Sequence, residues 1–301
     1  MRHLAPLPLL LLAAPAAAHG GGVLEPPGID SLALDPWVVL PLALSWVFYS
    51  RGTARLWRRA APGRGVPAWR AACFAAGWTS LLLALLPPLQ VAGHGLFTAH
   101  MLEHELLMVA AAPLLVLGRP IGPFLWALPP RARRGLGRVV QAPPVAAAWR
   151  ALTAPLVATL LHFVALWAWH LPRLFEAALE YPGLHRLQHA CFLGSALVFW
   201  WAMLERRPRA PGPAFVHLFV TSIHASLLGA LFLFAPRLWY PGQTLGAPGW
   251  GLSPLEDQQL GGLVMWLVAC SVYVVAALWV LSGWVRGVRP REVGDDALAA
   301  R

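Results

Sequence analysis

The chain has 301 residues, of which 58% are hydrophobic and only 12% are charged. Ordinary soluble domains carry about 25% charged residues, so this composition excludes that class and indicates an integral membrane protein. The net charge is +10 and every basic residue is an arginine, and the arginines fall between apolar runs rather than along one polar face. We therefore interpret the charge as a determinant of topology, with membrane lipid as a partner and no nucleic acid.

Residues 1–18 have the features of a cleavable signal peptide. They begin with Arg2, continue with a leucine-rich core and end in the small residues Ala16, Ala17 and Ala18. The core is too short to span a bilayer comfortably, which favours cleavage over an uncleaved anchor. The mature chain would then begin at His19 with an extracytoplasmic segment, residues 19–33. An N-terminal histidine can chelate Cu(II), although a tolerated residue behind the cleavage site is the simpler interpretation.

Seven apolar segments follow, each near the ~20 residues that a helix needs to cross a membrane. They lie at about 34–50, 70–89, 95–117, 152–170, 186–204, 214–235 and 260–284. We predict an all-α integral membrane protein, a bundle of seven transmembrane helices in residues 34–285. Residues 286–301 would form a short tail.

The arginines predict the orientation of this bundle. The connections after the first, third, fifth and seventh segments hold most of them, and the alternate connections hold at most two each. The positive-inside rule then places the N-terminus outside and the C-terminus in the cytoplasm, in agreement with the signal peptide. We expect a multi-pass protein of the bacterial plasma (inner) membrane.

The last segment has a clear helix start. Ser253 can be the N-cap, Pro254 the first helical residue and Glu256 the reciprocal capping partner. Gly261 and Gly262 follow just inside, where we expect them to let a neighbouring helix approach closely.

Two pairs of histidines share the spacing H-x-x-x-H, His100 with His104 and His185 with His189. At 100° per residue, the members of each pair lie 40° apart and line one face of a helix. Both pairs fall in the outer half of the predicted bundle, and together they make a plausible four-nitrogen metal site. Imidazole and thioether ligands suit copper, with zinc as the ordinary competitor.

Two neighbours on the first helix extend this candidate site. Met108 continues the histidine stripe one turn deeper, although methionines here are more commonly packing residues. Glu103 flanks the stripe and could be a ligand or could orient a histidine ring. Glu105 points about 100° away from His104 and would serve another helix contact or be protonated.

A lone histidine in a membrane helix more commonly bonds to a neighbouring helix than to a metal. We expect that role for His162, His217 and His224. The paired histidines differ, because several titratable groups at one depth each cost a few kcal/mol unless they have partners. A single haem held by one histidine from each of two helices also stays open, whereas two haems do not fit irons separated by only ~6 Å.

Three stretches of the sequence resemble one protein family: HMLEHELLMVAAAPLLVLGRP, WHLPRLFEAALEYPGLHRLQHACFLGSALVFWW and LSPLEDQQLGGLVMW. They resemble the CtaG family of cytochrome c oxidase assembly factors, associated with the caa(3)-type oxidase, over about residues 34 to 285. The resemblance implies a multi-pass plasma-membrane protein that is needed for an active haem-copper oxidase and handles copper. The family's histidine motifs fall on His100, His104, His170, His185 and His189, and its acidic helix start falls on Glu256 and Asp257.

We therefore expect a cytochrome c oxidase assembly factor, not an enzyme, with an outward-facing copper site between the third, fourth and fifth segments. Its partners would be an extracytoplasmic copper donor and a subunit of a haem-copper oxidase. The candidate ligands are His100, His104, His170, His185, His189, Glu103 and Met108.

Three other functions stay open. The main alternative is a zinc-dependent seven-helix membrane hydrolase, in which Glu103 or Asp257 activates a zinc-bound water. A copper transporter would need polar residues that continue to the cytoplasmic side. Only His217 and His224 could belong to such a path. A scaffold that binds no metal would need none of the paired histidines.

Overall fold

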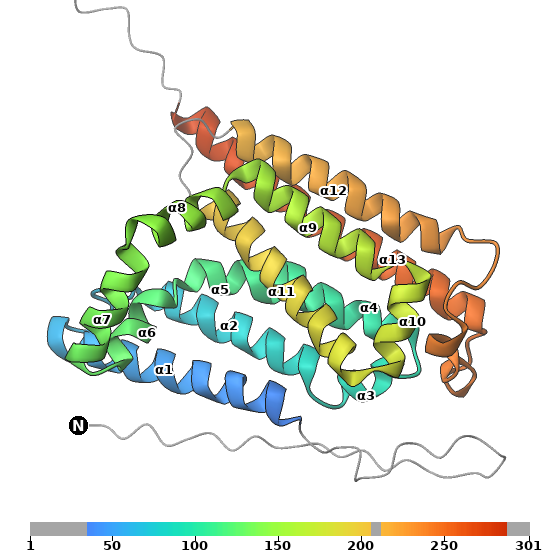
Figure 1. Ribbon diagram of the computed structural model, residues 1–301. Coiled ribbons are helices and arrows are strands. Elements are labelled where there is room, and N and C mark those ends of the chain that lie inside the picture. Colours follow the sequence, from blue (N-terminus) through green and yellow to red (C-terminus); the bar gives the residue numbers. More distant parts are fainter. Residues whose placement is uncertain (1–34, 206–211, 288–301) are drawn as a thin grey trace, which may run out of the picture. The chain divides into compact units, whose positions relative to one another are not determined.

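The computed structural model describes residues 35–205 and 212–287 of the chain. The predicted signal peptide, the segment 19–33 with His19, and residues 288–301 of the predicted tail lie outside the described residues. Within the described residues every regular element is a helix (Figure 1). In chain order these are α1 (Pro36–Ala60), α2 (Ala68–Leu85), α3 (Leu89–Gly93), α4 (Phe97–Glu105), η2 (Leu106–Ala111), α5 (Ala112–Gly118), α6 (Ile121–Ala127), α7 (Pro130–Gln141), α8 (Pro143–Leu152), α9 (Pro155–Trp169), α10 (Pro172–Glu180), α11 (Pro182–Leu204), α12 (Gly212–Leu233), η3 (Pro241–Thr244), η4 (Ala247–Trp250) and α13 (Pro254–Gly287).

Five helical stretches in the described residues are long and apolar enough to cross a membrane. They are α2, the continuous stretch α4–η2–α5, α11, α12 and the first 30 residues of α13. The pair α8 and α9 adds a sixth candidate with a 63° bend. A proline disfavours helical backbone in the residue before it, and Pro155 begins α9 at this bend.

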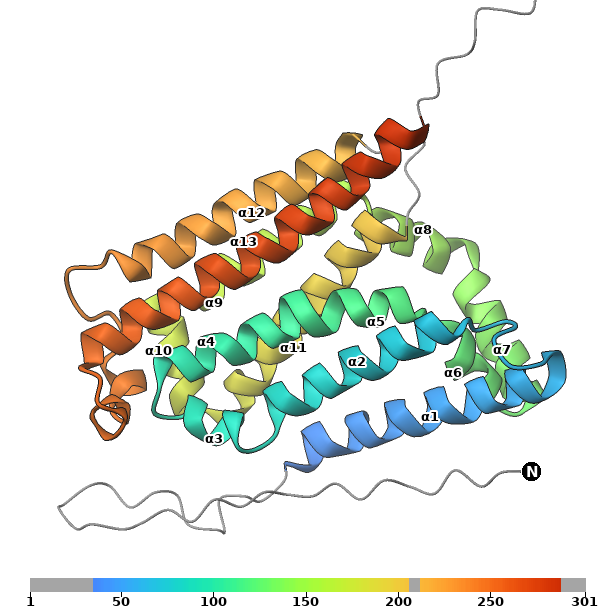
Figure 2. The same cartoon turned by 180° about the vertical axis from the view of Figure 1, so that it is seen from behind.

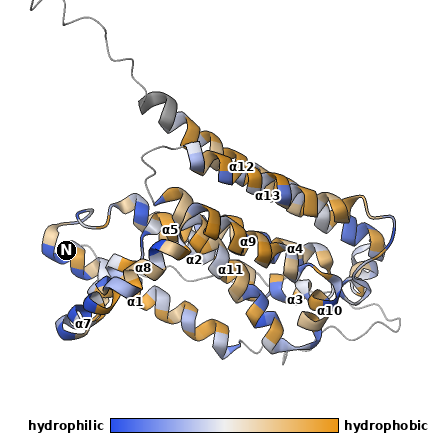
Figure 3. Ribbon diagram, turned by 45° about the horizontal axis from the view of Figure 1, so that its top comes forward, coloured by the Kyte–Doolittle hydropathy of each residue, from blue (hydrophilic) through white to orange (hydrophobic). Residues whose placement is uncertain are grey.

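The all-helical membrane architecture is thereby confirmed, with five or six candidate spans. The first predicted segment lies in α1, which is not among the candidates because its apolar stretch is short and its last turns carry Arg51, Arg55, Arg58 and Arg59. The count of seven spans and the orientation of the termini remain predictions. Figure 3 shows that α12 and α13 are mostly hydrophobic, whereas α7 is mostly hydrophilic, and no residue of α7 is buried.

Helices α12 and α13 run side by side (Figure 2) and touch through glycines. A Cβ on Gly262 would lie 2.7 Å from the Gly229 carbonyl oxygen, and one on Gly229 would lie 2.8 Å from the Gly262 carbonyl oxygen. A Cβ on Gly261 would lie 2.4 Å from the Phe97 ring of α4. The predicted packing role of Gly261 and Gly262 is confirmed, because any side chain there would push α12 or α4 away.

The predicted start of α13 is confirmed as well. The Ser253 N–H donates to the Glu256 carboxylate at 2.8 Å, and the Glu256 N–H donates to the Ser253 hydroxyl at 3.3 Å. These reciprocal bonds satisfy two backbone donors at the helix end. They fix the turn of α13 from which Asp257 reaches α4.

The stretch from α4 to α5 is one span with a π-helical segment, η2, in its middle. A π-helix widens the turn and leaves a backbone carbonyl free for another donor. The Trp200 indole of α11 donates to the Met108 carbonyl at 2.9 Å. The irregular backbone is therefore tied to α11, directly after the turns that carry His100 and His104.

Candidate metal centre

Helix α4, which carries the first histidine pair, is held at its start by a carboxylate from another helix. Asp257 of α13 accepts hydrogen bonds from the backbone N–H groups of Phe97 at 2.7 Å and Thr98 at 3.0 Å. The Thr98 hydroxyl donates back to the Asp257 carbonyl at 3.0 Å. The first N–H groups of a helix lack partners and carry a partial positive charge, so a buried carboxylate satisfies both needs. Asp257 thus fixes α4 relative to α13.

The two histidine pairs face one another across α4 and α11. The ring centroids are 4.3 Å apart for His100 and His104, and 4.4 Å apart for His185 and His189. Between the helices, His100 lies 5.4 Å from His185 and His104 lies 5.4 Å from His189. The structure therefore brings together the four imidazoles that share the H-x-x-x-H spacing.

These separations suit rings that share an ion. An imidazole nitrogen binds zinc at about 2.0–2.1 Å, so the centroids of two rings on one ion lie at most roughly 6.4 Å apart. All four separations are shorter than this limit. The geometry is compatible with coordination, which needs only side-chain rotations to aim the nitrogens.

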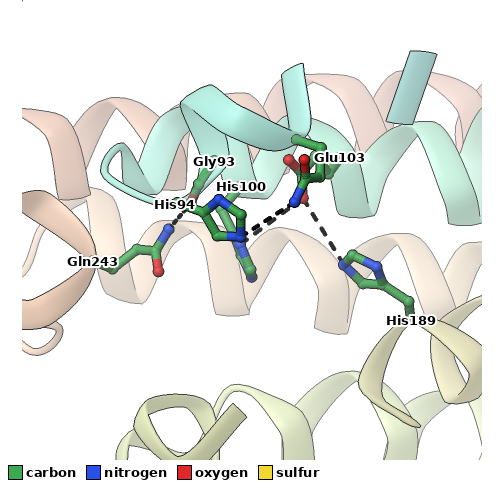
Figure 4. Close-up of polar contacts among 7 residues, drawn as sticks. Gly93, His94, His100, Glu103, His189 and Gln243 are labelled. Atoms are coloured by element: carbon green, nitrogen blue, oxygen red, sulfur yellow. Dashed lines mark hydrogen bonds and ion pairs between the residues drawn. The ribbon is translucent and has the colours of Figure 1, made fainter. Parts of the chain in front are cut away.

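One carboxylate joins the cluster (Figure 4). A Glu103 oxygen lies 4.0 Å from His100 Nδ1 and 3.9 Å from His189 Nε2. The ligand atoms of His100, Glu103 and His185 all lie within 4.8 Å of one another. Glu103 fits there because Gly93 has no side chain, since a Cβ at Gly93 would lie 2.3 Å from Glu103 Oε1.

His170, at the end of α9, approaches the cluster from its buried side. Its ring lies 5.8 Å from that of His104. Its Nδ1 donates to the Leu166 carbonyl at 2.6 Å, which leaves Nε2 with a free lone pair. A histidine that binds metal almost always has its other nitrogen held by such an acceptor.

The backbone of His170 is fixed by a second hydrogen bond. Its carbonyl accepts the hydroxyl of Tyr240, which is fully buried between α12 and η3. Burial, together with the charge of Glu176, raises the pKa of Tyr240 above its ordinary value of 10.0. The phenol therefore stays protonated and continues to donate over the physiological pH range.

The cluster is buried and its polar atoms lack hydrogen-bond partners. His100, Glu103 and His104 are each only 1% exposed. Within the described residues, seven of these buried atoms have no hydrogen bond. They are His100 Nε2, Glu103 Oε1, both ring nitrogens of His104, and Nε2 of His170, His185 and His189. Each such atom costs about 1–3 kcal/mol when it is left without a partner, so the arrangement indicates a ligand that would satisfy several of them at once.

Histidines elsewhere in the bundle have such partners. His162 contacts the Ser195 hydroxyl at 3.1 Å and the Tyr273 hydroxyl at 2.9 Å. His217 contacts the Thr159 hydroxyl at 3.0 Å, and His224 accepts from the Trp167 indole at 3.4 Å. The prediction that His162, His217 and His224 tie neighbouring helices together is confirmed, although Nε2 of His224 is also buried without a hydrogen-bond partner.

Comparison with known proteins identifies the family. The model of the family "Cytochrome c oxidase caa3 assembly factor" (Caa3_CtaG) matches residues 47–287, which include every histidine of the cluster. The chain belongs to this family. The resemblance seen in the three sequence motifs is therefore confirmed.

Two relatives of this CtaG-family protein are uncharacterized proteins of Mycobacterium bovis and Mycobacterium tuberculosis. Each is 27% identical over 279 residues, which are 85% of this chain and 39% of the relative. The chain thus spans about two fifths of the length of these relatives. No solved structure matches.

The candidate ligands of this CtaG-family protein separate into two groups. His100, His104, His185, His189, His170 and Glu103 lie together in the cluster. Met108 lies in the apolar core with Met101 and Val109, and its role as a ligand stays a prediction. The π-helical turn that carries Met108 was not visible in the sequence pattern.

Sequence reasoning missed three contributors to the site. His94 lies 6.3 Å from His185 and is exposed at the end of α3. Gln243 of η3 donates to the Gly93 carbonyl and so holds the turn against which Glu103 packs. Asp257 was seen as a helix start, but its contact with α4 joins residues about 160 positions apart and leaves no local signal.

Proposed function

We propose that this protein supports assembly of a caa3-type cytochrome c oxidase by binding copper in the histidine cluster and presenting it to an oxidase subunit. One observation carries the proposal: buried imidazole nitrogens and one carboxylate converge from α4, α11 and the end of α9 without hydrogen-bond partners. Membership of the oxidase assembly family supports copper as the cargo.

The donor set suits a transition-metal ion. Neutral imidazole binds copper and zinc well, and the single carboxylate compensates part of the charge of a buried cation. Binding should be reversible, because the exposed His94 and the half-buried His185 leave one end of the cluster accessible. The predicted orientation puts that end near the outer face, where an extracytoplasmic donor could deliver copper.

The hydrogen bonds of Asp257 argue against the zinc-hydrolase hypothesis, because they remove one of its two candidate bases. Both oxygens of Asp257 accept backbone hydrogen bonds from α4, so Asp257 is not available as a base. Glu103 would have to serve alone. The set His100, Glu103 and His185 does match the two-histidine, one-glutamate pattern of some zinc enzymes, so metal identity is the decisive measurement.

The remaining alternatives have less support. A transporter path through His217 and His224 meets histidines that are engaged with Thr159 and Trp167. A haem between α4 and α11 would have to displace rings that contact one another, such as His100 and His185. A scaffold role predicts that oxidase assembly survives replacement of the paired histidines.

Metal analysis of the purified full chain tests the proposal. The protein is equilibrated with copper or zinc, separated from free metal and measured by plasma mass spectrometry, as wild type and as His104→Ala and His189→Ala. We expect both variants to hold less copper than the wild type, because α4 and α11 both contribute rings to the cluster. His217→Ala, which removes a histidine outside the cluster, should retain copper.

The same variants should lower the copper content of the oxidase in the host membrane. Unchanged copper content in His104→Ala and His189→Ala would overturn the proposal. Stoichiometric zinc together with hydrolysis of lipid amides would establish the hydrolase instead.

A further inference from the structure

The histidine rings of the cluster form a chain from an exposed end to a buried end. His94 is exposed, and its ring lies 6.3 Å from His185. From His185 the next ring is His100 at 5.4 Å, followed by His104 at 4.3 Å and His170 at 5.8 Å. Successive rings are thus close enough to share an ion, whereas none of the ring contacts within the described residues joins His94 or His185 directly to His170.

The two ends of this chain have different donors. At the outer end, the ligand atoms of His100, Glu103 and His185 lie within 4.8 Å of one another. At the inner end, the ring of His170 neighbours that of only one other histidine of the described residues, His104. Within the described residues, His185 and His170 are thus linked through His100 and His104 and not by a ring contact of their own.

The inner end has the features of a site in its own right. His170 Nδ1 is held by the Leu166 carbonyl, and Nε2 is buried without a partner. Both ring nitrogens of His104 are buried and without partners as well, so His104 can offer one nitrogen to each end.

Phenylalanine rings enclose this inner end. The ring of Phe192 lies 4.6 Å from His104 and 5.6 Å from His170, and Phe232 of α12 lies 5.9 Å from His170. Both phenylalanines are fully buried. Their rings offer no conventional hydrogen bonds, so the nitrogens at this end have no partner from the neighbouring side chains.

We propose that the cluster holds copper at two successive positions, an outer one formed by His100, Glu103 and His185 and an inner one formed by His104 and His170. His189 lies between them, 5.4 Å from His104 and 6.3 Å from His100. This inference rests on the proposed function and adds a second, enclosed position to it. Copper moves inward by exchange of one copper–nitrogen bond for another, without a change of oxidation state.

His170→Asn is the variant that isolates the inner position. Asparagine places its amide nitrogen where Nδ1 of histidine lies, so it can still donate to the Leu166 carbonyl, but it has no counterpart of Nε2. His224→Asn is the matched control, because His224 is also buried but lies outside the cluster.

The purified full chain is loaded with Cu(I) under anaerobic conditions, and bound copper is counted and then withdrawn with a soluble Cu(I) chelator. Wild type and His224→Asn should bind two equivalents and release them in a fast and a slow phase. His170→Asn should bind one equivalent and show only the fast phase. The equivalent that remains shows that the variant is folded.

One equivalent in wild type, unaffected by His170→Asn, would overturn the two positions and leave the proposed function intact. No bound copper in wild type would overturn both. If His170→Asn does not fold, the wild-type protein decides the question, because release of all copper in one phase contradicts an enclosed inner position.

Discussion

Gly93 contributes to the cluster by what it lacks. The Glu103 carboxylate occupies the space that a side chain at position 93 would fill, and the Gly93 carbonyl accepts a hydrogen bond from Gln243. The absence of a side chain at Gly93 thus leaves room for Glu103, the only carboxylate of the cluster as described. Its neighbour Gly95 has more room, since a Cβ there would meet its nearest atoms at 3.4 Å.

Gly93→Ala should therefore weaken metal binding without removing a ligand. The added methyl group displaces Glu103, and loss of such a supporting contact typically costs about 10–100-fold in metal affinity. The measurement is competition with a chelator of known affinity. Gly95→Ala is the control and should bind as wild type does. Equal affinities for both variants would show that Glu103 takes no part in binding.

At the scale of elements, the position of α4 depends on α13. Asp257 closes the open end of α4, and the glycine contacts of α13 bring it close enough to do so. The capping box at Ser253 and Glu256 sets where α13 begins. The histidine pair of α4 is thus placed by a helix that contributes no ligand.

Asp257→Ala should destabilise the protein and weaken metal binding together. Loss of a capping side chain costs about 0.5–2 kcal/mol, and two buried N–H groups would lose their acceptor. Thermal unfolding and copper affinity in detergent measure the two effects. Asp257→Asn keeps one acceptor oxygen and should lie between wild type and Asp257→Ala. X-ray absorption should find the same copper ligands in all three proteins, whereas a change of ligands would make Asp257 part of the coordination sphere.

A second tie between elements lies next to His185. Arg186 of α11 bonds to Asp35, which also accepts from the Trp37 N–H at the start of α1. Burial raises the pKa of Asp35, but the bonds from Arg186 and Trp37 and the guanidinium charge outweigh it, so the pKa falls below its ordinary value of 3.8. A lowered pKa means that the folded state favours the carboxylate.

The stabilisation from Asp35 should accordingly be complete at neutral pH and disappear as the pH falls below about 4. Asp35→Asn should lower the unfolding midpoint at pH 7 and match wild type near pH 3. The effect should be less than about 1 kcal/mol and shrink with added salt, because the pair is partly exposed. A deficit that persists at pH 3 would mean that charge is not the cause.

Local sequence patterns predicted where the helices lie, but they did not predict most of the contacts between the helices. The predicted segments 70–89, 95–117, 186–204, 214–235 and 260–284 coincide with candidate spans, because hydropathy depends on neighbouring residues. The turn spacing of His100 with His104 and His185 with His189 likewise predicted which rings share a face. The π-helix, the bend before α9 and the long-range bonds of Asp257 and Gln243 had no such signal, since they depend on packing between distant parts of the chain.

At the scale of the whole molecule, the number of spans decides on which side the N-terminus lies. If α1 crosses the membrane with the six other candidates, the two ends are on opposite sides. If α1 lies along the surface, they are on the same side. The Arg55 guanidinium donates to the carbonyl of Trp126, so the arginine-rich end of α1 lies beside the end of α6 in either arrangement.

We expect an extracytoplasmic N-terminus and a cytoplasmic C-terminus. Ser31→Cys, in a variant whose three native cysteines are replaced, should react with a membrane-impermeant maleimide in intact spheroplasts. A fluorescent protein fused after the C-terminus should fold and fluoresce. Protection of the cysteine together with a fluorescent C-terminus would mean six spans.

The nitrogens of the cluster that lack hydrogen-bond partners should also affect how long the protein survives in the cell. A chain that folds around imidazoles without partners bears a cost that a bound ion relieves, and any ligand that favours the folded state shifts the equilibrium towards it. If the cluster binds copper as proposed, copper-starved cells would hence degrade this protein sooner than copper-replete cells. Its lifetime would follow the supply of its cargo, so that the amount of assembly factor is matched to the metal available, without a separate sensor.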